Sequence, residues 1–422
     1  MSSISELAAP TQRLSVSALV MTSIYTLGVN AVWLSYNIFI LPVQMQSVTS
    51  ESTKGIALGA LVGVAIGLAV IVNIIAGIIS DHSNSRFGRR RPMMMWGMVL
   101  TLPFLLLPVF FPLSLLTVSV AYLGMQIFTN VSSGAFQPTL ADFIPVDQRG
   151  TSAGFKGVFT LIGAAIGVGV ITALFAANLE SAAYILIAVI FVITTLINTI
   201  AMRPYDKPIS NVQPLKLREV LVDMFRIQKR SAGFFWFVFC SFLIYMGVSG
   251  FQFFGVYYLE SVLHITRQEA LARAVQISGL LSLVMSMIFA LLAGFLSDKL
   301  GRRNIIIVSA LIAAAVGIFF PFARTFVIFL AFSSLYAASN GVILSVDTAL
   351  TSDLVPLEEA GKYMAYANLA VGVANGVAPP IFGLILNFQG APTLNSFIAF
   401  FVVSAAFFII SSFVMAFKVP NR

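Results

Sequence analysis

The chain has 422 residues, of which 59% are hydrophobic and only 9% are charged, and its formal net charge is +8. Soluble proteins carry about 25% charged residues, so the composition excludes a soluble enzyme, a disordered chain and a disulfide scaffold. With one cysteine and two distant histidines, no metal site and no cofactor is expected. The basic excess is expected to set orientation in a lipid bilayer rather than to bind nucleic acid.

Charged residues divide the chain into long apolar segments. A membrane-spanning helix needs about 20 apolar residues. Eight segments fit one helix each and the two longest fit two, with breaks expected at Pro112 and in the turn 387–392. The charge-free segments are 14–50, 55–80, 92–141, 157–179, 181–202, 231–259, 274–297, 304–323, 325–346 and 363–417. The sequence therefore predicts an all-α integral membrane protein with 12 transmembrane helices.

These helices fall into two equal sets. We expect an N-terminal six-helix bundle at 1–202, a cytoplasmic linker at 203–230 and a C-terminal six-helix bundle at 231–422. If the N-terminus is cytoplasmic, all but four of the 24 Lys and Arg residues lie on the cytoplasmic side, which predicts that both termini are cytoplasmic. The four outer exceptions are Lys54, Arg267, Arg273 and Arg324.

The two sets repeat a local pattern. Gly77 and Asp81, followed by Gly88-Arg89-Arg90, match Gly294 and Asp298, followed by Gly301-Arg302-Arg303. A second pair of landmarks, Asp142-Phe-Ile-Pro145 and Asp353-Leu-Val-Pro356, recurs at nearly the same separation. Two pseudo-symmetric bundles follow, an arrangement that suits a carrier whose halves rock around a central site.

The pattern Gly-x-x-x-Asp-x-x-Gly-Arg-Arg at 294–303 resembles the signature loop of the major facilitator superfamily. The resemblance covers the whole chain and implies the major facilitator fold, with transport of a small molecule by alternating access and one chain forming a complete carrier, hence a monomer. The longer loop at 81–92 is similar to that of the glycoside–pentoside–hexuronide symporters and the plant sucrose carriers. This second resemblance implies a sugar or glycoside as substrate.

Charges in these loops are candidates for a cytoplasmic gate. Asp81 and Asp298 end their helices where arginines or helix N-termini can meet them. Such pairs can latch the cytoplasmic side, whereas the alternative is that the charges only set topology. By the resemblance, further acidic and basic residues join the latch. The full gating set is Asp81, Arg89, Arg90, Asp142, Arg149, Asp298, Arg302, Arg303 and Asp353.

Polar and aromatic side chains inside the apolar spans are candidates for binding substrate. Polar groups at mid-membrane are costly unless they face protein or water. Amides can bond sugar hydroxyls and rings can stack on a sugar face, whereas the alternative is that each residue only joins two helices. The candidates are Asn30, Trp33, Tyr36, Asn37, Gln126, Asn130, Gln252, Tyr257, Tyr336, Asn340 and Asn375.

Two ionisable residues are unmatched in the repeat and are candidates for ion coupling. Asp347 corresponds to Phe136 in the first half, and Lys156 corresponds to Ala367 in the second. We predict that Asp347 couples transport to protons or forms an ion pair with Lys156, whereas the alternative is a water-exposed or paired residue near the cytoplasmic mouth. Melibiose-type carriers have acidic residues for the cation in the second span, but residues 55–80 contain none, which argues against sodium coupling. Sucrose carriers have a charged residue in the fourth span, but residues 113–141 contain none, so their mechanism does not transfer directly either.

The function predicted is secondary active transport of a small polar solute, with a sugar or glycoside as the leading class. The sequence leaves open whether transport is coupled to protons. An exporter or antiporter of drugs or other amphiphilic compounds is an alternative. Drug–proton antiporters of the superfamily carry a motif rich in glycine and proline in the fifth span, but residues 157–179 contain no proline. A non-transporting membrane sensor is another alternative. An enzyme is not expected, because no P-loop or nucleophile motif is present. The short tails favour a multi-pass protein of a prokaryotic inner membrane.

Overall fold

The computed structural model describes residues 13–83, 85–206, 232–266, 268–354 and 360–420. Within these ranges the chain is helical and contains no strand. Most of the predicted linker 203–230 lies outside them. Twelve helical segments are long and apolar enough to cross a membrane, which confirms the predicted number.

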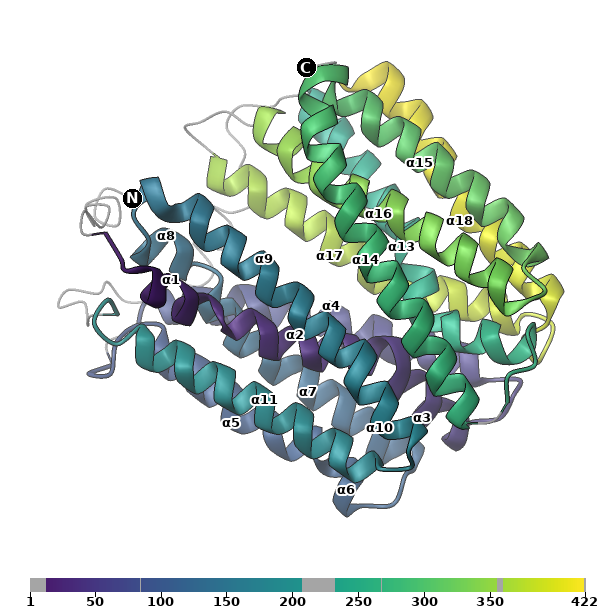
Figure 1. Ribbon diagram of the computed structural model, residues 1–422, viewed down its shortest axis with the longest axis horizontal. Coiled ribbons are helices and arrows are strands. Elements are labelled where there is room, and N and C mark those ends of the chain that lie inside the picture. The colour runs from purple at the N-terminus through teal and green to yellow at the C-terminus, as the bar shows by residue number, and fades with distance from the viewer. Residues whose placement is uncertain (1–12, 84, 207–231, 267, 355–359, 421–422) are drawn as a thin grey trace. The chain divides into compact units, whose positions relative to one another are not determined.

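Figure 1 labels the helices and colours them from purple at the N-terminus to yellow at the C-terminus. The helices are α1 Val16–Ser23, α2 Tyr25–Ser35, α3 Leu41–Val48, α4 Lys54–Asp81, α5 Arg91–Leu105, α6 Leu107–Phe110, α7 Leu115–Phe136, α8 Thr139–Phe143, α9 Arg149–Ala165, α10 Thr172–Ala176, α11 Glu180–Ala201, α13 Ala232–Ser261, α14 Gln268–Leu300, α15 Arg302–Phe319, α16 Phe326–Leu354, α17 Ala360–Asn387 and α18 Leu394–Lys418. Two π-helical segments, Tyr36–Ile40 and Ile166–Ile171, continue the first and fifth spans.

Side-chain caps fix where several spans begin. Ser114 accepts a hydrogen bond from the amide of Thr117 at the start of α7, just after the predicted break at Pro112. Thr393 and Ser396 form a reciprocal capping box at the start of α18, after α17 ends at Asn387 as predicted. Both breaks in the long apolar segments are therefore confirmed.

The backbone conformation of the two signature loops explains why each contains a glycine. Gly88 has φ of 104° and Gly301 has φ of 85°, a region that side chains with a Cβ rarely adopt. Each glycine comes directly before the arginines that open α5 or α15. The loop therefore needs glycine here to turn the chain into the next helix.

The chain divides into two compact units. Unit 1 comprises residues 1–36, 68–174 and 179–219, and unit 2 comprises residues 37–67, 175–178 and 220–422. In unit 1, α5 packs on α7 and α11; in unit 2, α15 packs on α16 and α18. The same packing in each half of the sequence agrees with the internal repeat. The outer part of span 1 and the first half of α4 belong to unit 2 together with the C-terminal helices.

Candidate functional site

The first signature loop forms a compact cluster of charges in unit 1. The Asp142 carboxylate accepts hydrogen bonds from Arg89 Nη2 at 2.5 Å and Arg90 Nε at 2.8 Å. Arg90 also pairs with Asp81, and only 2% of its side chain is exposed. Because a buried guanidinium is costly without carboxylate partners, these residues must be held together. Four of the predicted gating residues therefore meet at one point.

Asp206, which is not among the predicted gating residues, completes this cluster. Its carboxylate accepts hydrogen bonds from the backbone amides of Arg89, Arg90 and Arg91 at 2.8 to 3.2 Å. These amides open α5 and have no partner inside the helix, so Asp206 caps it from the end of the sixth span. The sequence shows only that an aspartate follows the sixth span by a few residues, on the same predicted side of the membrane as the basic loop 86–91.

Arg149 lies beside the cluster but pairs differently from the expected latch. Its guanidinium donates to the backbone carbonyls of Ala141 and Ile144 at 3.0 and 3.2 Å, rather than to the Asp142 carboxylate. Arg149 therefore satisfies the free carbonyl groups at the end of α8. In this position it supports the loop that carries Asp142.

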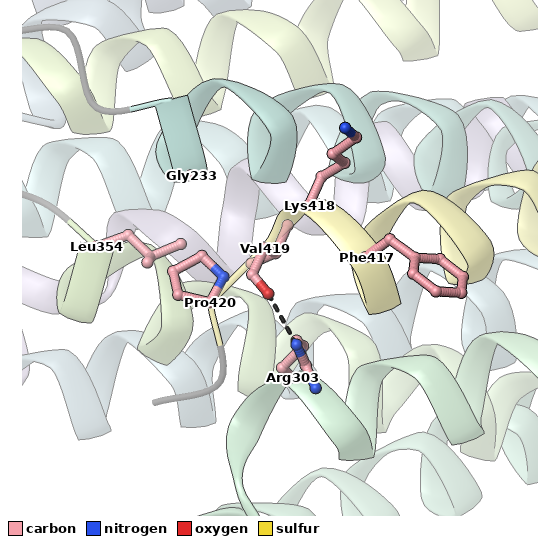
Figure 2. A pocket seen from close by; sticks show the side chains of 7 residues that line it. All are labelled: Gly233, Arg303, Leu354, Phe417, Lys418, Val419 and Pro420. Carbon is pink, nitrogen blue, oxygen red and sulfur yellow. Dashed lines mark hydrogen bonds between the residues drawn. The ribbon is translucent and has the colours of Figure 1, made fainter.

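The second signature loop is paired more loosely, in unit 2. Arg302 Nη1 lies 2.7 Å from Asp353 Oδ1, with 26% and 32% of the two side chains exposed. Arg303 instead donates to the Val419 carbonyl at 2.9 Å (Figure 2). The side chain of Asp298 lies outside the described part of the chain. A pocket beside Arg303 is lined by Gly233, Leu354, Phe417, Lys418, Val419 and Pro420, and contains none of the predicted substrate residues.

In unit 1 the structure brings some of the predicted substrate residues together. Asn130 donates to the Gln126 carbonyl at 2.9 Å and accepts from Asn73 at 3.3 Å, while Gln126 donates to the Tyr122 hydroxyl at 3.0 Å. Trp33 Nε1 donates to Thr129 Oγ1 at 3.2 Å on the same helix, α7. These side chains join α2, α4 and α7 through a polar seam inside the unit.

The remaining predicted residues of the first span have different surroundings. Asn30 donates to the Thr26 carbonyl of its own helix at 2.8 Å. Tyr36 is buried at 1% exposure, where its ring packs with Tyr122 and Tyr184. Asn37 is buried at the start of the segment that belongs to unit 2.

In unit 2 the predicted substrate residues lie on three helices. Asn375 of α17 accepts a hydrogen bond from Ser249 of α13, and Gln252 is half-buried one turn further along α13. Tyr336 of α16 donates to the Gly247 carbonyl at 3.0 Å. Asn340, one turn after Tyr336, has a buried Oδ1 that no described residue hydrogen-bonds. Tyr257 lies apart from these, with its hydroxyl on the Pro42 carbonyl at 3.2 Å.

The two coupling candidates lie in different units. Asp347 of α16 is 7% exposed, and its Oδ1 accepts a hydrogen bond from Ser241 of α13 at 2.7 Å. Lys156 of α9 rests its ammonium 4.4 Å from the centre of the Phe136 ring. Within its own unit, neither residue forms an ion pair with a described side chain. The sequence offered no signal for Ser241, which is one of many hydroxyl residues in the spans.

The twelve spans, the internal repeat and the paired signature loops define a membrane carrier of two related bundles. The family model "Major Facilitator Superfamily" matches residues 14–289 and 277–422, so the chain belongs to this superfamily and is a membrane transporter of that type. The family and the fold agree with the expectation that the protein is a carrier rather than an enzyme.

Solved structures with the same fold include transporters that are named for different solutes. A nucleoside transporter aligns with a TM-score of 0.75 at 15% identity, covering 96% of this chain and 100% of its own. A D-xylose–proton symporter aligns with a TM-score of 0.70 at 18% identity, covering 96% and 98%. A bacterial homologue of the human lysosomal transporter Spinster aligns with a TM-score of 0.71 at 16% identity, over the same shares.

Curated relatives match a short part of the chain. The MFS transporter asaE of Aspergillus flavus is 32% identical over 100 residues, which are 23% of this chain and 22% of the relative. Citrate exporter 1 of Yarrowia lipolytica is 33% identical over 105 residues, which are 24% and 15%. The chain therefore spans less than a quarter of the length of these relatives.

Proposed function

We propose that this transporter moves a small polar solute, with a sugar or glycoside as the leading class, by alternating access and in symport with protons. The observation that carries the proposal is the unsatisfied Oδ1 of Asn340, a buried acceptor in the tenth span. Buried polar atoms are rarely left without a partner, so a solute with hydroxyl donors fits this position. The D-xylose–proton symporter and the nucleoside transporter, both with hydroxyl-bearing cargoes, support this class by analogy.

Asp347 supplies the proposed proton site. It follows Asn340 by seven residues on α16, so the two side chains share one helix face about 10 Å apart. Its carboxylate accepts one hydrogen bond, from Ser241, and pairs with no described cation of unit 2. A buried carboxyl group that has no fixed counter-ion can gain and lose a proton as the carrier changes state.

Uptake into proteoliposomes tests the proposal. A panel of labelled monosaccharides and disaccharides is offered with and without an inward proton gradient. We expect one sugar to accumulate, and to accumulate more with the gradient. Uptake at the same rate with and without proton and sodium gradients would contradict symport and would indicate a facilitator instead. If none of the sugars enters, the proposed substrate class is wrong.

Export of an organic anion is a second candidate, favoured by Lys156. This lysine is packed on the Phe136 ring and pairs with no carboxylate among the described residues of unit 1, so a substrate carboxylate could supply one. The partial match to a citrate exporter points to the same chemistry. Counterflow of labelled tricarboxylate, abolished by Lys156→Gln and retained by Lys156→Arg, would favour this candidate over sugar transport.

A further inference from the structure

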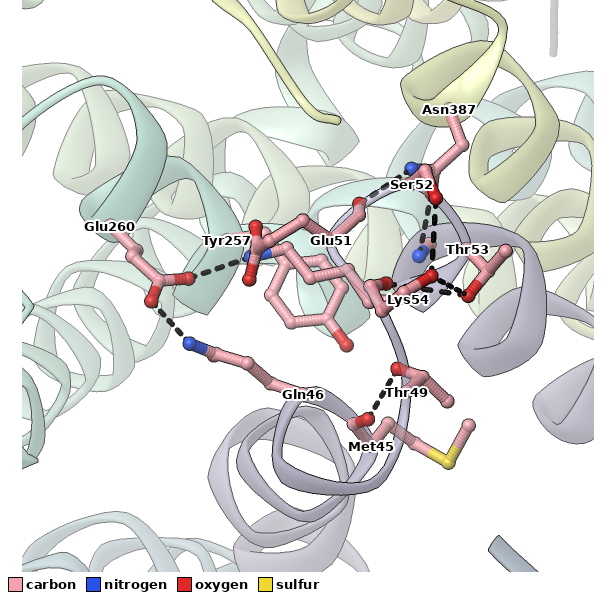
Figure 3. Close-up of polar contacts among 12 residues, drawn as sticks. Met45, Gln46, Thr49, Glu51, Ser52, Thr53, Lys54, Tyr257, Glu260 and Asn387 are labelled. Carbon is pink, nitrogen blue, oxygen red and sulfur yellow. Dashed lines mark hydrogen bonds and ion pairs between the residues drawn. The ribbon is translucent and has the colours of Figure 1, made fainter. Parts of the chain in front are cut away.

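A charged cluster lies in unit 2 at the outer end of the spans, the end predicted to face away from the cytoplasm. Lys54 opens α4, and its side chain is only 1% exposed. Its ammonium lies 2.9 Å from Glu260 Oε2 on α13 and 2.8 Å from Glu51 Oε2 (Figure 3). Gln46 of α3 donates to the same Glu260 carboxylate. One carboxylate of the seventh span therefore holds both the first and the second span.

Burial explains why these contacts must act together. An ammonium taken out of water is unfavourable unless it is paired and hydrogen-bonded. Glu51 remains 62% exposed, whereas Glu260 is 16% exposed, so Glu260 is the partner shielded with Lys54. The Tyr257 ring lies 4.9 Å from the ammonium and closes the inner side of the cluster. Lys54 can therefore stay buried only while α13 remains against it.

Asn387 ties the same end of α4 to the eleventh span. Its Oδ1 accepts hydrogen bonds from the amides of Gly55 at 2.6 Å and Ile56 at 3.2 Å. Its Nδ2 donates to the carbonyls of Glu51 at 3.0 Å and Gly390 at 2.7 Å. The first amides of a helix have no partner within it. The last residue of α17 thus caps a helix that lies more than 300 positions earlier in the sequence.

Close backbone packing continues from this cap along α4. A Cβ added at Gly59 would lie 2.3 Å from the Pro379 carbonyl oxygen, and one at Gly63 would lie 2.4 Å from Pro380 Cγ. Gly67 is the next glycine in this row, and a Cβ there would meet no atom within 4 Å. The tight contact between α4 and α17 is therefore confined to the outer half of α4.

We propose that these contacts form the outer gate of the transporter. The Lys54–Glu260 pair, the Asn387 cap and the Gly59–Pro379 contact hold spans 1 and 2 closed against spans 7 and 11. They separate together when the solute path opens to the outside. The inference rests on the proposed function only in that the protein transports, because none of these residues is assigned to a particular solute.

Cysteine labelling from the outside tests the gate without any substrate. A Cβ at Gly376 of α17 would lie 3.7 Å from the Gly63 carbonyl oxygen, an ordinary van der Waals contact, so Gly376→Cys provides a reporter at the α4–α17 contact. A membrane-impermeant maleimide reaches it from the outside when that contact opens. Cys240 is buried on α13 about 30 Å from Glu260 along the helix, and serves as the control for unfolding. The label on the reporter is obtained by subtracting that on the parent, which has Cys240 alone.

We expect Glu260→Gln to raise the labelling rate of the reporter about ten-fold or more, because it leaves Lys54 with an exposed partner only. Gly59→Ala is expected to act in the same direction by pushing Pro379 away, whereas Gly67→Ala, its neighbour in open space, should leave the rate unchanged. Cys240 should remain unreactive in every variant.

Two results would overturn the gate. One is an unchanged reporter rate in both Glu260→Gln and Gly59→Ala; the other is a rise in Gly67→Ala equal to that in Gly59→Ala. If Glu260→Gln also exposes Cys240, the variant has unfolded and the Gly59→Ala result decides. A rate that rises as expected in a protein that moves no sugar would keep the gate and reject the proposed substrate class.

Discussion

Ser241 donates a hydrogen bond of 2.7 Å to the carboxylate of Asp347, and so joins the seventh and tenth spans inside unit 2. A buried carboxylate is unfavourable unless hydrogen bonds or a counter-charge stabilise it. One hydroxyl donor orients the Asp347 side chain but leaves its second oxygen available. This geometry suits a group that must exchange a proton rather than one fixed in a permanent ion pair.

Replacing this carboxylate should separate binding from coupling. Asp347→Asn keeps the shape of the side chain and can still bond to Ser241, but it cannot carry the proton. We expect stimulation of uptake by an inward proton gradient to disappear, while exchange of labelled for unlabelled solute continues. Thr351→Val is the matched control, because among the described residues the Thr351 hydroxyl bonds to the Asp347 backbone carbonyl and not to its carboxylate. Gradient-driven accumulation that survives in Asp347→Asn would rule out this coupling role.

Removing the unsatisfied amide in the tenth span should weaken solute binding. Asn340→Ala deletes an acceptor that we assign to the solute, and one hydrogen bond contributes about 1 kcal/mol. We therefore expect KM to rise about five-fold in uptake assays, with a smaller change in the maximal rate. Asn368→Ala removes an exposed amide of α17 and should leave KM unchanged. Equal effects of the two substitutions would show that Asn340 has no special role.

The spans could be predicted from the sequence because lipid imposes a simple rule. Helices of about 20 apolar residues must be separated by polar loops, so the charges marked the twelve spans and the two internal breaks. The glycines and arginines of the signature loops were also visible, since the repeat shows them twice. It was harder to predict which of these charged residues contact one another. Asp142 was selected, but its partnership with both Arg89 and Arg90 depends on tertiary packing.

Lys54 shows why the rest could not be predicted. In the sequence it is one of four basic residues on the outer side, and topology alone explains it. Its near-complete burial depends on Glu260 and Tyr257, which lie more than 200 positions away. Asn387 similarly looked like part of a loop break. Contacts of this kind depend on how separate helices pack, and one sequence carries no record of that packing.

The two signature loops should differ in how much they stabilise the protein. Asp142→Asn would leave the buried Arg90 with the half-exposed Asp81 as its carboxylate partner, and breaking a buried pair costs about 3 kcal/mol or more. Asp353→Asn removes a pair whose side chains are 26% and 32% exposed, so solvent screens the loss and the cost should be smaller. Melting temperatures of the detergent-solubilised variants should therefore fall further for Asp142→Asn. The reverse order would contradict this assignment.

Asp206 should stabilise the N-terminal helices although it lies in no recognised motif. Its carboxylate caps three successive amides of α5, whereas a typical helix cap that bonds one amide is worth about 1 kcal/mol. We expect Asp206→Ala to lower the free energy of unfolding by about 2 kcal/mol, measured as a loss of melting temperature. Asp147→Ala is the matched control, because Asp147 pairs with Arg13 at the surface, where 48% and 77% of the side chains are exposed. Exposed pairs contribute little, so its melting temperature should stay close to that of the parent. If both variants melted together with the parent, the three amides would be solvated equally well without Asp206, and the cap would not stabilise the loop that holds Arg89 and Arg90.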